Sequence, residues 1–554
     1  MRDLGFEKCQ LKFEFGGSEH QEQKKFVKFD NSIILGYLKN KTILITGSTG
    51  FVGKVLVEKI LRVQPNVKKL YLLLRAPDAN SATRRMHNEI TGKELFKVLK
   101  EKWGADFDSF ILEKVVALPG DVRFEDLGVK PVKLMEEICN EVQIILNSAA
   151  ITTFEERYDI ASEVNTFGVL NLLDFAKKCL KLEMIVHVST GFTCDACFPA
   201  YVCGERAGMI LEDSSSMEEM AKKPSKYDLK LQEKKLVEDK LKELKALNAS
   251  EEDITSAMKN LGTARAKLYG WPNTYALTKV MGEMYLGHAK GNLSIAVVRP
   301  TMITSTYKEP FSGWIEGFRT YDSLIGGYWK GKLTGIPVDP MAVVDMIPVD
   351  MVVNSIITAM VVNANKSRKN IYHLGTSYRN PLTFSDFNNF MFQYCTKNPL
   401  LNENGFPIKV GKLKILRSME AFHLYMQIPL QALKFMNKEF DQYFQDIYAN
   451  YNMKIKSVRR LVDLYRAYLL FKGIFDDTNA EELRRIASEK YTDAGSFNFD
   501  PKCIYWEDYF MHTHIPGLAK HVIINQTQTK SALNEQIITS CADITGRNEY
   551  NNGY

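Results

Sequence analysis

The chain has 554 residues, of which 45% are hydrophobic and 25% are charged, proportions that are ordinary for a globular protein. This length exceeds what a single hydrophobic core normally organises, so two folded units with terminal extensions are expected. The net charge of +6 fits a protein with an anionic ligand and gives no reason to expect nucleic acid as a partner.

Cysteine usage and hydropathy restrict the cellular compartment. The nine cysteines are odd in number and mostly isolated, which is typical of a reducing compartment and not of a disulfide framework. No run of about 18 uninterrupted apolar residues is present, and the most apolar stretch, residues 341–362, contains Asp345, Pro348, Asp350 and Asn354. The N-terminus has neither an apolar signal core nor the acid-poor composition of a transit peptide. We therefore expect a cytosolic chain, with docking on a membrane surface left open.

The first half of the chain alternates strands and helices. Residues 1–38 are polar and irregular and are expected to form a flexible leader. A buried strand at Lys41–Ile45, a helix over Lys54–Arg62 and a second strand at Leu70–Leu74 form a β-α-β unit. Further strand candidates, separated by helical stretches, lie at 114–118, 143–146, 184–188 and 295–298. This alternation predicts an α/β fold, a doubly wound parallel sheet of the extended Rossmann type, over residues 39–393.

Three later segments depart from this alternation. Residues 205–268 are rich in charge and indicate a helical insertion, with one long helix expected over Asp228–Leu247. Residues 394–520 are aromatic and helical in character, which predicts a mainly helical C-terminal domain. Residues 521–554 are polar with few large apolar side chains and are expected to be disordered.

A glycine-rich loop follows the first strand and precedes the first helix. Gly47 would allow the tight turn, Gly50 would let the backbone approach a pyrophosphate, and Gly53 would let the helix pack closely on the strand. The helix N-terminus would then offer N–H groups to phosphates. A purely structural loop is the alternative, but the strand–turn–helix context favours nucleotide binding. The cofactor-binding candidates in this loop are Thr46, Gly47, Thr49, Gly50, Phe51 and Gly53.

Arg75, at the end of the second strand, indicates which dinucleotide is bound. An acidic residue at this position would accept hydrogen bonds from the ribose of NAD, whereas an arginine pairs with a 2′-phosphate, so NADPH is favoured. Arg84 and Arg85 either assist or are ordinary surface residues. By strand order, Asp121 and Val122 are expected near the adenine, and Ala149, within 147–150, near the ribose and nicotinamide.

Tyr275 and Lys279 are the candidate proton-transfer pair. They are four residues apart, so they lie on one face of a helix. A phenol is a poor proton donor near pH 7 unless a neighbouring cation stabilises its phenolate, and Lys279 would do so while also binding the nicotinamide ribose. The same spacing recurs at Tyr37/Lys41, Tyr328/Lys332 and Tyr468/Lys472. Position distinguishes them, because only Tyr275 lies on a helix directly before a buried strand of the nucleotide-binding half.

Ser189 and Thr190 follow the strand 184–188 and supply hydroxyls at the carboxyl edge of the sheet, where one could polarise a carbonyl oxygen. Thr190 is the preferred donor and Ser189 the next, with a helix cap or turn as the alternative role. Cys194, Cys197 and Cys203 lack a second matched ligand pair, so no metal site is predicted.

Together these residues resemble the plant alcohol-forming fatty acyl-CoA reductases, the group that includes the male-sterility proteins. The resemblance covers about residues 38–520 and rests on KTILITGSTGF (Lys41–Phe51), VKKLYLLLR (Val67–Arg75), GWPNTYALTK (Gly270–Lys279), VRPT (Val298–Thr301), STYKEP (Ser305–Pro310), FKGIFDD (Phe471–Asp477) and WEDY (Trp506–Tyr509).

The resemblance implies a fold, a reaction and a location. The fold would be an extended Rossmann reductase domain with a C-terminal helical "sterile" domain, and Pro300 joins the cofactor-binding candidates. The implied reaction converts a long-chain fatty acyl-CoA, or an acyl carrier protein thioester, and two NADPH into a fatty alcohol for wax, suberin or pollen-wall lipid. Because a transit peptide is missing, the resemblance implies the endoplasmic reticulum surface. It implies no particular oligomeric state.

The sequence departs from the family pattern at its ends and beside the candidate oxyanion donor. The leader and the tail are longer than expected. The family usually runs from Val-Ser-Thr directly into Ala-Tyr-Val-Cys-Gly-Glu, but here Val188–Thr190 and Ala200–Glu205 are separated by residues 191–199. Misplacing a catalytic group by about 1 Å can cost about a hundredfold in rate. Either this loop bulges outward and is tolerated, or the protein is impaired.

Two alternatives to the reductase hypothesis remain. Another extended short-chain dehydrogenase, acting on a sugar nucleotide or a steroid, would share the glycines and the Tyr/Lys pair but would not explain the C-terminal domain or the insertion. A non-catalytic nucleotide- or lipid-binding protein is the second. Separately, residues 454–475 combine basic and apolar side chains, which indicates either an interfacial membrane helix or an amphipathic helix packed on its own domain.

Overall fold

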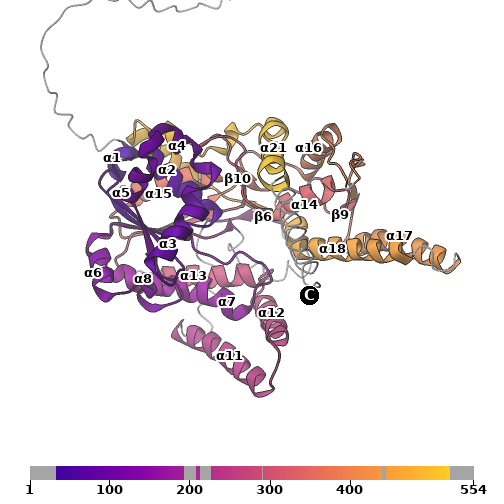
Figure 1. Ribbon diagram of the computed structural model, residues 1–554, viewed down its shortest axis with the longest axis horizontal. Helices are drawn as coiled ribbons and strands as arrows, with labels where there is room; N and C mark the ends of the chain where they lie inside the picture. The colour runs from indigo at the N-terminus through magenta and orange to yellow at the C-terminus, as the bar shows by residue number, and fades with distance from the viewer. Residues whose placement is uncertain are drawn as a thin grey trace, which may run out of the picture.

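A computed structural model describes residues 33–191, 207–212, 226–289, 291–402, 404–439 and 445–524. Its centre is a sheet of seven strands in the order β11-β7-β5-β4-β1-β2-β3, and each neighbouring pair is parallel (Figure 1). The strands are β1 (Thr42–Thr46), β2 (Lys69–Leu74), β3 (Val115–Pro119), β4 (Ile144–Asn147), β5 (Met184–Val188), β7 (Ile295–Pro300) and β11 (Lys369–Leu374). The doubly wound α/β fold expected from the sequence is confirmed.

Six of these strands were predicted from their apolar runs, and their ends differ from the expectation by at most two residues. Apolar residues alternate between the two faces of the sheet. Ile43 and Ile45 enter one hydrophobic cluster and Leu44 enters the other. The seventh strand, β11, was missed because it begins with Lys369 and Asn370 and so lacks a continuous apolar run.

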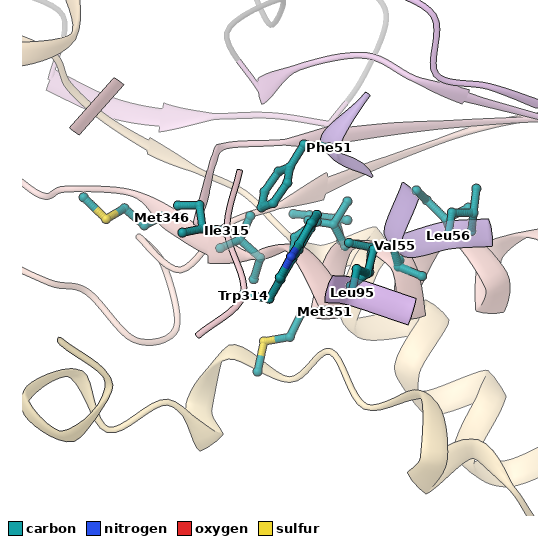
Figure 2. Close-up of a cluster of buried hydrophobic side chains, with 14 of the residues drawn as sticks. Phe51, Val55, Leu56, Leu95, Trp314, Ile315, Met346 and Met351 are labelled. Atoms are coloured by element: carbon teal, nitrogen blue, oxygen red, sulfur yellow. The ribbon is translucent and has the colours of Figure 1, made fainter. Parts of the chain in front are cut away.

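Helices cover both faces. On one side α2 (Phe51–Val63) and α15 (Val349–Asn363) pack together, and Figure 2 shows the core beneath α2, where Phe51 and Val55 meet Trp314 and Met351. The other face carries α6 (Val132–Glu141), α8 (Gly168–Lys178) and α13 (Thr274–Ala289). The strand order reverses between β1 and β4, and ligands bind at the carboxyl ends of strands at such a point.

The described chain is folded from residue 34 onward. Ile34–Leu38, which fall inside the expected leader, form helix α1 and bury Ile34 and Leu38. The backbone N–H groups of Ile34 and Leu35 donate to the carboxylate of Asp493 at 2.8 and 3.0 Å. The folded unit therefore includes these residues, and the remaining leader, residues 1–32, lies outside the described part.

The described part of the insertion is mainly helical, as expected, with α11 (Lys226–Ala246) and α12 (Glu251–Leu268) following the short strand β6 (Ala207–Ile210). It is more than a solvated appendage. Tyr158 donates a 2.7 Å hydrogen bond to the buried carboxylate of Glu233, and Arg265 forms an ion pair with that carboxylate. Because these contacts join α11 and α12 to α7 (Tyr158–Ser162), the insertion is anchored beside α13 (Figure 1).

The C-terminal region is mainly helical, as expected. Its helices include α16 (Phe384–Lys397), α17 (Met419–Glu439), α18 (Gln445–Leu469), α19 (Thr478–Lys490), α20 (Trp506–Asp508) and α21 (Ile515–Leu518). The last described turn, Ala519–Ile524, continues beyond residue 520, where the tail was expected to begin, and the tail from 525 onward lies outside the described residues.

Short elements complete the described fold. The helices are α3 (Ala79–Met86), α4 (Lys97–Trp103), α5 (Phe107–Lys114) and α14 (Thr320–Trp329). The strand pairs are β10 (Met346–Pro348) with β8 (Met302–Thr304), β12 (Lys414–Leu416) with β9 (Gly335–Pro337), and β13 (Lys472–Phe475) with β6 (Ala207–Ile210).

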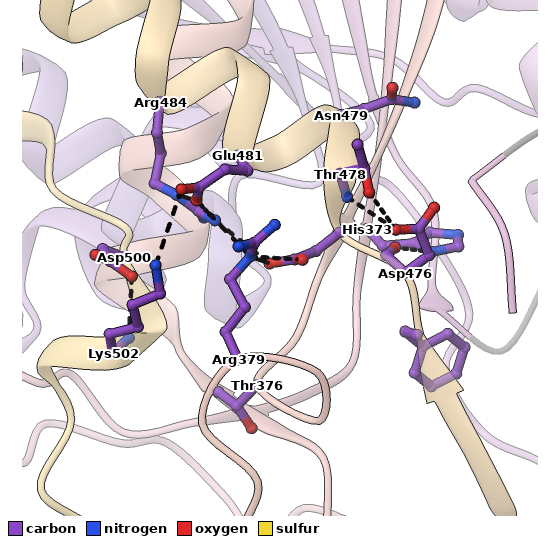
Figure 3. Close-up of polar contacts among 12 residues, drawn as sticks. His373, Thr376, Arg379, Asp476, Thr478, Asn479, Glu481, Arg484, Asp500 and Lys502 are labelled. Atoms are coloured by element: carbon purple, nitrogen blue, oxygen red, sulfur yellow. Dashed lines mark hydrogen bonds and ion pairs between the residues drawn. The ribbon is translucent and has the colours of Figure 1, made fainter. Parts of the chain in front are cut away.

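Polar contacts attach the C-terminal region to the sheet. Arg379 donates to Asp477 at 2.7 Å, and Arg484 lies 3.3 Å from the same carboxylate (Figure 3). His373, on β11, contacts the carbonyl oxygen of Asp476 through Nδ1 at 2.8 Å. The region that follows the sheet is therefore held against its β11 edge.

Helices α17 and α18 form a hairpin that projects from the body (Figure 1). The segment 454–475 is not one interfacial helix, because α18 ends at Leu469 and Lys472–Phe475 form strand β13. Val462 and Leu469 are buried, so this part of α18 packs on its own domain. No helix in the described part of the chain is both long and apolar enough to cross a membrane.

Candidate active site

A cavity of about 640 Å³ opens at the carboxyl ends of the central strands. The glycine loop forms one wall and the C-terminal end of α18 another. Ten of the residues proposed from the sequence line this cavity: Gly47, Thr49, Gly50, Phe51, Gly53, Ser189, Thr190, Tyr275, Lys279 and Pro300.

The glycine loop has the geometry that a dinucleotide requires. Gly47 has φ +69°, and a Cβ there would lie 2.5 Å from the backbone nitrogen of Ala149. A Cβ on Gly53 would lie 2.3 Å from the carbonyl oxygen of Gly47, so close packing of helix on loop excludes a side chain. Gly50 is the N-cap of α2, and no acidic residue occupies the first turn. A phosphate at this helix N-terminus would meet a favourable dipole and no repelling carboxylate.

Thr46 and Ala149 support the loop from behind. The hydroxyl of Thr46 donates to the side-chain oxygen of Asn147 at 2.7 Å and accepts from the backbone N–H of Ala149 at 3.2 Å. Neither residue lines the cavity. Their contacts fix the end of β1 against the end of β4, and so set the position of the glycine turn.

Arg75, Asp121 and Val122 stand at the ends of β2 and β3, outside the cavity wall. The side chain of Arg75 is exposed, whereas Arg85 donates to the backbone carbonyl of Arg75 and to Glu89. The carboxylate of Asp121 accepts from Arg123 at 2.9 Å, and Val122 is buried.

Tyr275 lies on α13 and presents its ring to the cavity. Burial raises the pKa of its phenol to about 12, and a hydrogen bond with the side chain of Thr190 opposes this shift. The side chains of these two candidates, which were proposed separately from the sequence, therefore contact each other.

Lys279 is buried one helical turn further along. Its ammonium Nζ donates a 2.8 Å hydrogen bond to the carbonyl oxygen of Val188, at the end of β5. Burial lowers the pKa of Lys279 to about 8, against an opposing effect of Glu283. The lysine is thus a cation with reduced proton affinity that lines the same cavity as the tyrosine.

Ser189 and Thr190 are both buried at the end of β5, but they have different partners. The side chain of Ser189 hydrogen-bonds Glu283, whereas Thr190 contacts the phenol of Tyr275. The two hydroxyls thus have partners of different kinds, a buried carboxylate for Ser189 and the phenol of Tyr275 for Thr190.

The sequence reasoning missed Glu283 and Arg299. Glu283 lies four residues after Lys279 on the same helix face, and Arg299 contacts its carboxylate at 2.5 Å. Both side chains are fully buried, and His373 lies 3.2 Å from Arg299. Burial raises the pKa of Glu283, but Arg299 and Ser189 more than offset this and lower it to about 2. The four-residue spacing of Lys279 and Glu283 was the signal available in the sequence. Only the fold shows that Arg299, on another element, is the counterion of Glu283.

The aromatic wall of the cavity was also missed. Phe154 stacks on Tyr468 with ring centroids 5.1 Å apart and on Tyr275 at 5.9 Å. Tyr465 meets Phe154 edge-on at 5.8 Å, and the hydroxyl of Tyr468 accepts from Asn273 at 3.0 Å. Residues from α18 thus reach the catalytic tyrosine candidate, a contact that no local motif indicates.

Cys194, Cys197, Cys203 and the inserted residues after Gly191 lie outside the described residues. Within the described ranges, no group of three His, Cys, Asp or Glu side chains could hold a metal ion.

Comparison with known proteins identifies the family. An NAD-binding family model described as male sterility protein matches residues 45–356, and a second model with the same description matches residues 425–524. The chain is 49% identical to a probable fatty acyl-CoA reductase 4 of Arabidopsis thaliana, over 89% of this chain and 99% of that protein. It is 48% identical to an alcohol-forming fatty acyl-CoA reductase of Simmondsia chinensis, over 88% of this chain and 99% of that protein.

A solved structure supports the fold assignment. The terminal reductase domain of the myxalamid biosynthetic pathway aligns with a TM-score of 0.51 and 16% identity, over 87% of this chain and 91% of that one. The family matches extend over both the sheet and the C-terminal helices, which separates the chain from the sugar-nucleotide and steroid enzymes considered as alternatives. The chain belongs to the male sterility protein family of NAD(P)-binding fatty acyl-CoA reductases.

Proposed function

We propose that this protein reduces long-chain fatty acyl-CoA to the primary fatty alcohol with two NADPH, for a wax, suberin or pollen-wall lipid. The observation that carries the proposal is the placement of Thr190, Tyr275 and Lys279 in one cavity with the glycine loop. Its relatives from Arabidopsis and Simmondsia bear the corresponding enzyme names. The donor set fits an NADPH, because the helix N-terminus offers N–H groups and lacks acidic residues.

The first half-reaction would reduce the thioester. Bound NADPH supplies hydride, once to the thioester carbonyl and once to the aldehyde. The hydroxyls of Tyr275 and Thr190 would stabilise the negative charge that develops on the carbonyl oxygen, because the two side chains hydrogen-bond each other and line the same cavity. Collapse of the resulting hemithioacetal breaks the C–S bond, releasing CoA as the thiol and leaving an aldehyde.

The second half-reaction would reduce that aldehyde in the same cavity. Tyr275 donates its phenolic proton to the alkoxide as the second hydride arrives, which gives the alcohol. Burial makes ionisation of the phenol still less favourable, so a cation in the same cavity, the ammonium of Lys279, is needed to stabilise the phenolate. Glu283 and Arg299 fix the end of β5 through Ser189, and so hold Thr190 in place.

The preference for NADPH over NADH is assigned to Arg75. Its exposed guanidinium at the end of β2 is available to a 2′-phosphate, and Asp121 and Val122 would border the adenine. Thr46 would support the glycine loop through Ala149, which would lie near the ribose and nicotinamide. Pro300 and Lys279 would border the nicotinamide half.

The experiment that tests the proposal is expression in yeast followed by fatty alcohol profiling. The expected result is alcohols of long chain length that are absent from cells expressing Tyr275→Phe. Purified protein is then offered fatty acyl-CoA, an acyl carrier protein thioester, a UDP-sugar and a steroid, each with NADPH. Turnover of the sugar nucleotide or the steroid alone would overturn the proposal, and NADPH binding without turnover of any acyl thioester would identify a non-catalytic protein.

The insertion is tested separately. We propose that residues 191–199 leave the site intact, because Ser189 and Thr190 at the preceding strand end retain their contacts to Glu283 and Tyr275. Deleting 191–199 should leave kcat and KM for acyl-CoA within about twofold. A large gain in kcat in the deletion variant would show that the inserted residues impair the enzyme.

We propose the endoplasmic reticulum surface as the location, with the α17–α18 hairpin as the contact to lipid. The hairpin exposes apolar side chains together with basic ones, namely Leu424, Ile428, Phe435, Ile447 and Met453 with Lys434, Lys454 and Lys456. Such a surface suits an anionic bilayer, in which apolar groups insert while lysines meet phosphates.

Flotation of the full chain on vesicles tests this contact. Binding to vesicles containing phosphatidylserine is expected to fall sharply in Ile428→Asp/Phe435→Asp. The matched control is Leu112→Asp, which changes an exposed leucine on α5 far from the hairpin in sequence. Equal flotation of the hairpin and control variants would exclude the hairpin as the membrane contact.

A further inference from the structure

Arg319 is an unassigned cation in the wall of the cavity, immediately before α14. Its guanidinium carbon lies 3.9 Å from the ring centroid of Phe51. Phe51 is the first residue of α2 and follows Gly50, the N-cap of that helix. The guanidinium is thus positioned beside the glycine loop, although the two segments are far apart in sequence.

The charge of Arg319 is not matched by an ion pair with any described carboxylate. Its Nη2 donates to the backbone carbonyl of Glu316 at 3.0 Å, and its Nε is buried without a hydrogen-bond partner in the described structure. The side chains of the two nearest acids have other partners. The carboxylate of Glu316 pairs with Lys54, and that of Asp322 contacts His514 at 3.0 Å and accepts from the backbone N–H of Arg319 at 3.1 Å.

A guanidinium in this position favours an anion. Burial lowers the pKa of Arg319, while Asp322 and Glu316 oppose that shift, so the cation is only partly compensated. An arginine remains charged in proteins, and its planar fork of N–H donors matches phosphate oxygens in a bidentate manner. The alternative is that Arg319 merely packs α14 on α2 by stacking on Phe51, which would leave its buried Nε unsatisfied.

We propose that Arg319 binds a diphosphate group in this cavity, beside the glycine loop. This inference rests on the proposed function, in which two ligands, NADPH and acyl-CoA, each carry a diphosphate. The position of the guanidinium against Phe51, at the N-terminus of α2, assigns it to the diphosphate of the dinucleotide. Arg319 then contacts the part of the cofactor that NADPH and NADH share, whereas Arg75 contacts the 2′-phosphate that only NADPH carries.

The test measures dissociation constants for NADPH and NADH on the purified full chain. Arg319→Met keeps the apolar stem and removes the charge, and it is expected to weaken both ligands equally, by about tenfold to a hundredfold. Arg75→Met is the matched control and is expected to weaken NADPH alone. Arg319→Lys keeps the charge but not the planar fork, so an intermediate loss of affinity for both dinucleotides, about threefold to tenfold, is expected. The lysine variant replaces the methionine variant in the test if the latter does not fold.

A second measurement distinguishes the two diphosphates. At saturating NADPH, the KM values for a fatty acyl-CoA and for the matching free aldehyde, which has no CoA, are compared in Arg319→Met. If Arg319 binds the dinucleotide, the ratio of the variant's KM to the wild-type KM is expected to be the same for the two substrates. A rise confined to acyl-CoA, with unchanged NADPH binding, would overturn the assignment to the dinucleotide in favour of CoA.

Unchanged dissociation constants for NADPH and NADH, together with an unchanged KM for acyl-CoA, in Arg319→Met and Arg319→Lys would overturn the inference entirely. Arg319 would then be a packing residue. Failure of the proposed function is distinguishable from this outcome. A wild-type protein that binds NADPH but reduces no acyl thioester contradicts the proposed function, while the dissociation constants still decide the role of Arg319.

Discussion

Tyr468 stacks on Phe154 with ring centroids 5.1 Å apart, although more than half of the chain separates them in sequence. Through this contact the last helix of the hairpin completes the wall around Tyr275. The C-terminal region is thus part of the active site and not an appendage to it.

Replacing Tyr468 should therefore affect the substrate more than the cofactor. Tyr468→Ala is expected to raise KM for acyl-CoA about tenfold or more, because an aromatic pair contributes about 0.5–1.5 kcal/mol beyond the area that it buries. Tyr468→Phe keeps the stack and loses the hydroxyl that accepts from Asn273, so the free energy of acyl-CoA binding is expected to change by about 1 kcal/mol or less. Steady-state kinetics with NADPH titration check both, and a loss of NADPH affinity equal to the loss for acyl-CoA would contradict the placement.

Tyr275→Phe should abolish alcohol formation and spare cofactor binding. The variant removes the proton donor and its contact to Thr190 without changing the ring that stacks on Phe154. General acid catalysis of this kind contributes about 10²–10⁴-fold in rate. Product formation and the dissociation constant for NADPH are measured side by side, and full activity of the variant would remove Tyr275 from the mechanism.

The pH profile should report Lys279. Its pKa of about 8 in the folded protein lies below its ordinary value, so the ammonium is lost as pH rises through about 8. Since the cation is needed to stabilise the phenolate, kcat/KM of the wild type is expected to fall above that pH. In Lys279→Arg the cation persists to much higher pH, so the fall in kcat/KM should begin at a higher pH than in the wild type. A wild-type profile that stays flat from pH 7 to pH 10 would show that the charge of Lys279 is not required.

The Glu283–Arg299 pair, which joins α13 to β7, should contribute strongly to the free energy of unfolding. Glu283→Gln leaves a buried guanidinium without its counterion, and breaking such a pair costs about 3–5 kcal/mol of the free energy of unfolding. The pKa of Glu283 is depressed to about 2, so its stabilising effect is present above its ordinary value of 4.5 and is lost as pH falls from there toward 2.

Urea unfolding at pH 7 and at pH 4 measures this effect. The control is Glu482→Gln, because Glu482 forms an exposed pair with Arg485 at 2.6 Å, and exposed pairs contribute about 0–1 kcal/mol. Equal losses in the two variants would contradict the central role of the buried pair.

Gly53→Ala should disrupt the cofactor site. The added Cβ would lie 2.3 Å from the carbonyl oxygen of Gly47, which is backbone and cannot rotate away. The turn would have to shift, and NADPH affinity is expected to fall at least about tenfold. Gly411→Ala, where an added Cβ meets nothing within 4 Å, is the control and should bind NADPH as the wild type does. Isothermal titration of both variants checks the expectation, and normal binding by Gly53→Ala would exclude tight loop packing as a requirement.

The sequence determined those features whose signal is local. Apolar runs such as Leu70–Leu74 specify buried parallel strands, because both faces of such a strand must be covered, and the spacing of Gly47, Gly50 and Gly53 follows from steric limits within one turn. The pairing of Tyr275 with Lys279 follows from the helical repeat.

The tertiary structure decided everything that depends on neighbours from other elements. Ser189 and Thr190 are adjacent in sequence, yet one meets Glu283 and the other Tyr275, because α13 packs across the end of β5. Strand β11, the Arg299 counterion, the stacking of Tyr468 on Phe154 and the guanidinium of Arg319 over Phe51 have no local signature. Side-chain periodicity reports which face a residue occupies, whereas the identity of its partner across that face is set only when the chain is packed.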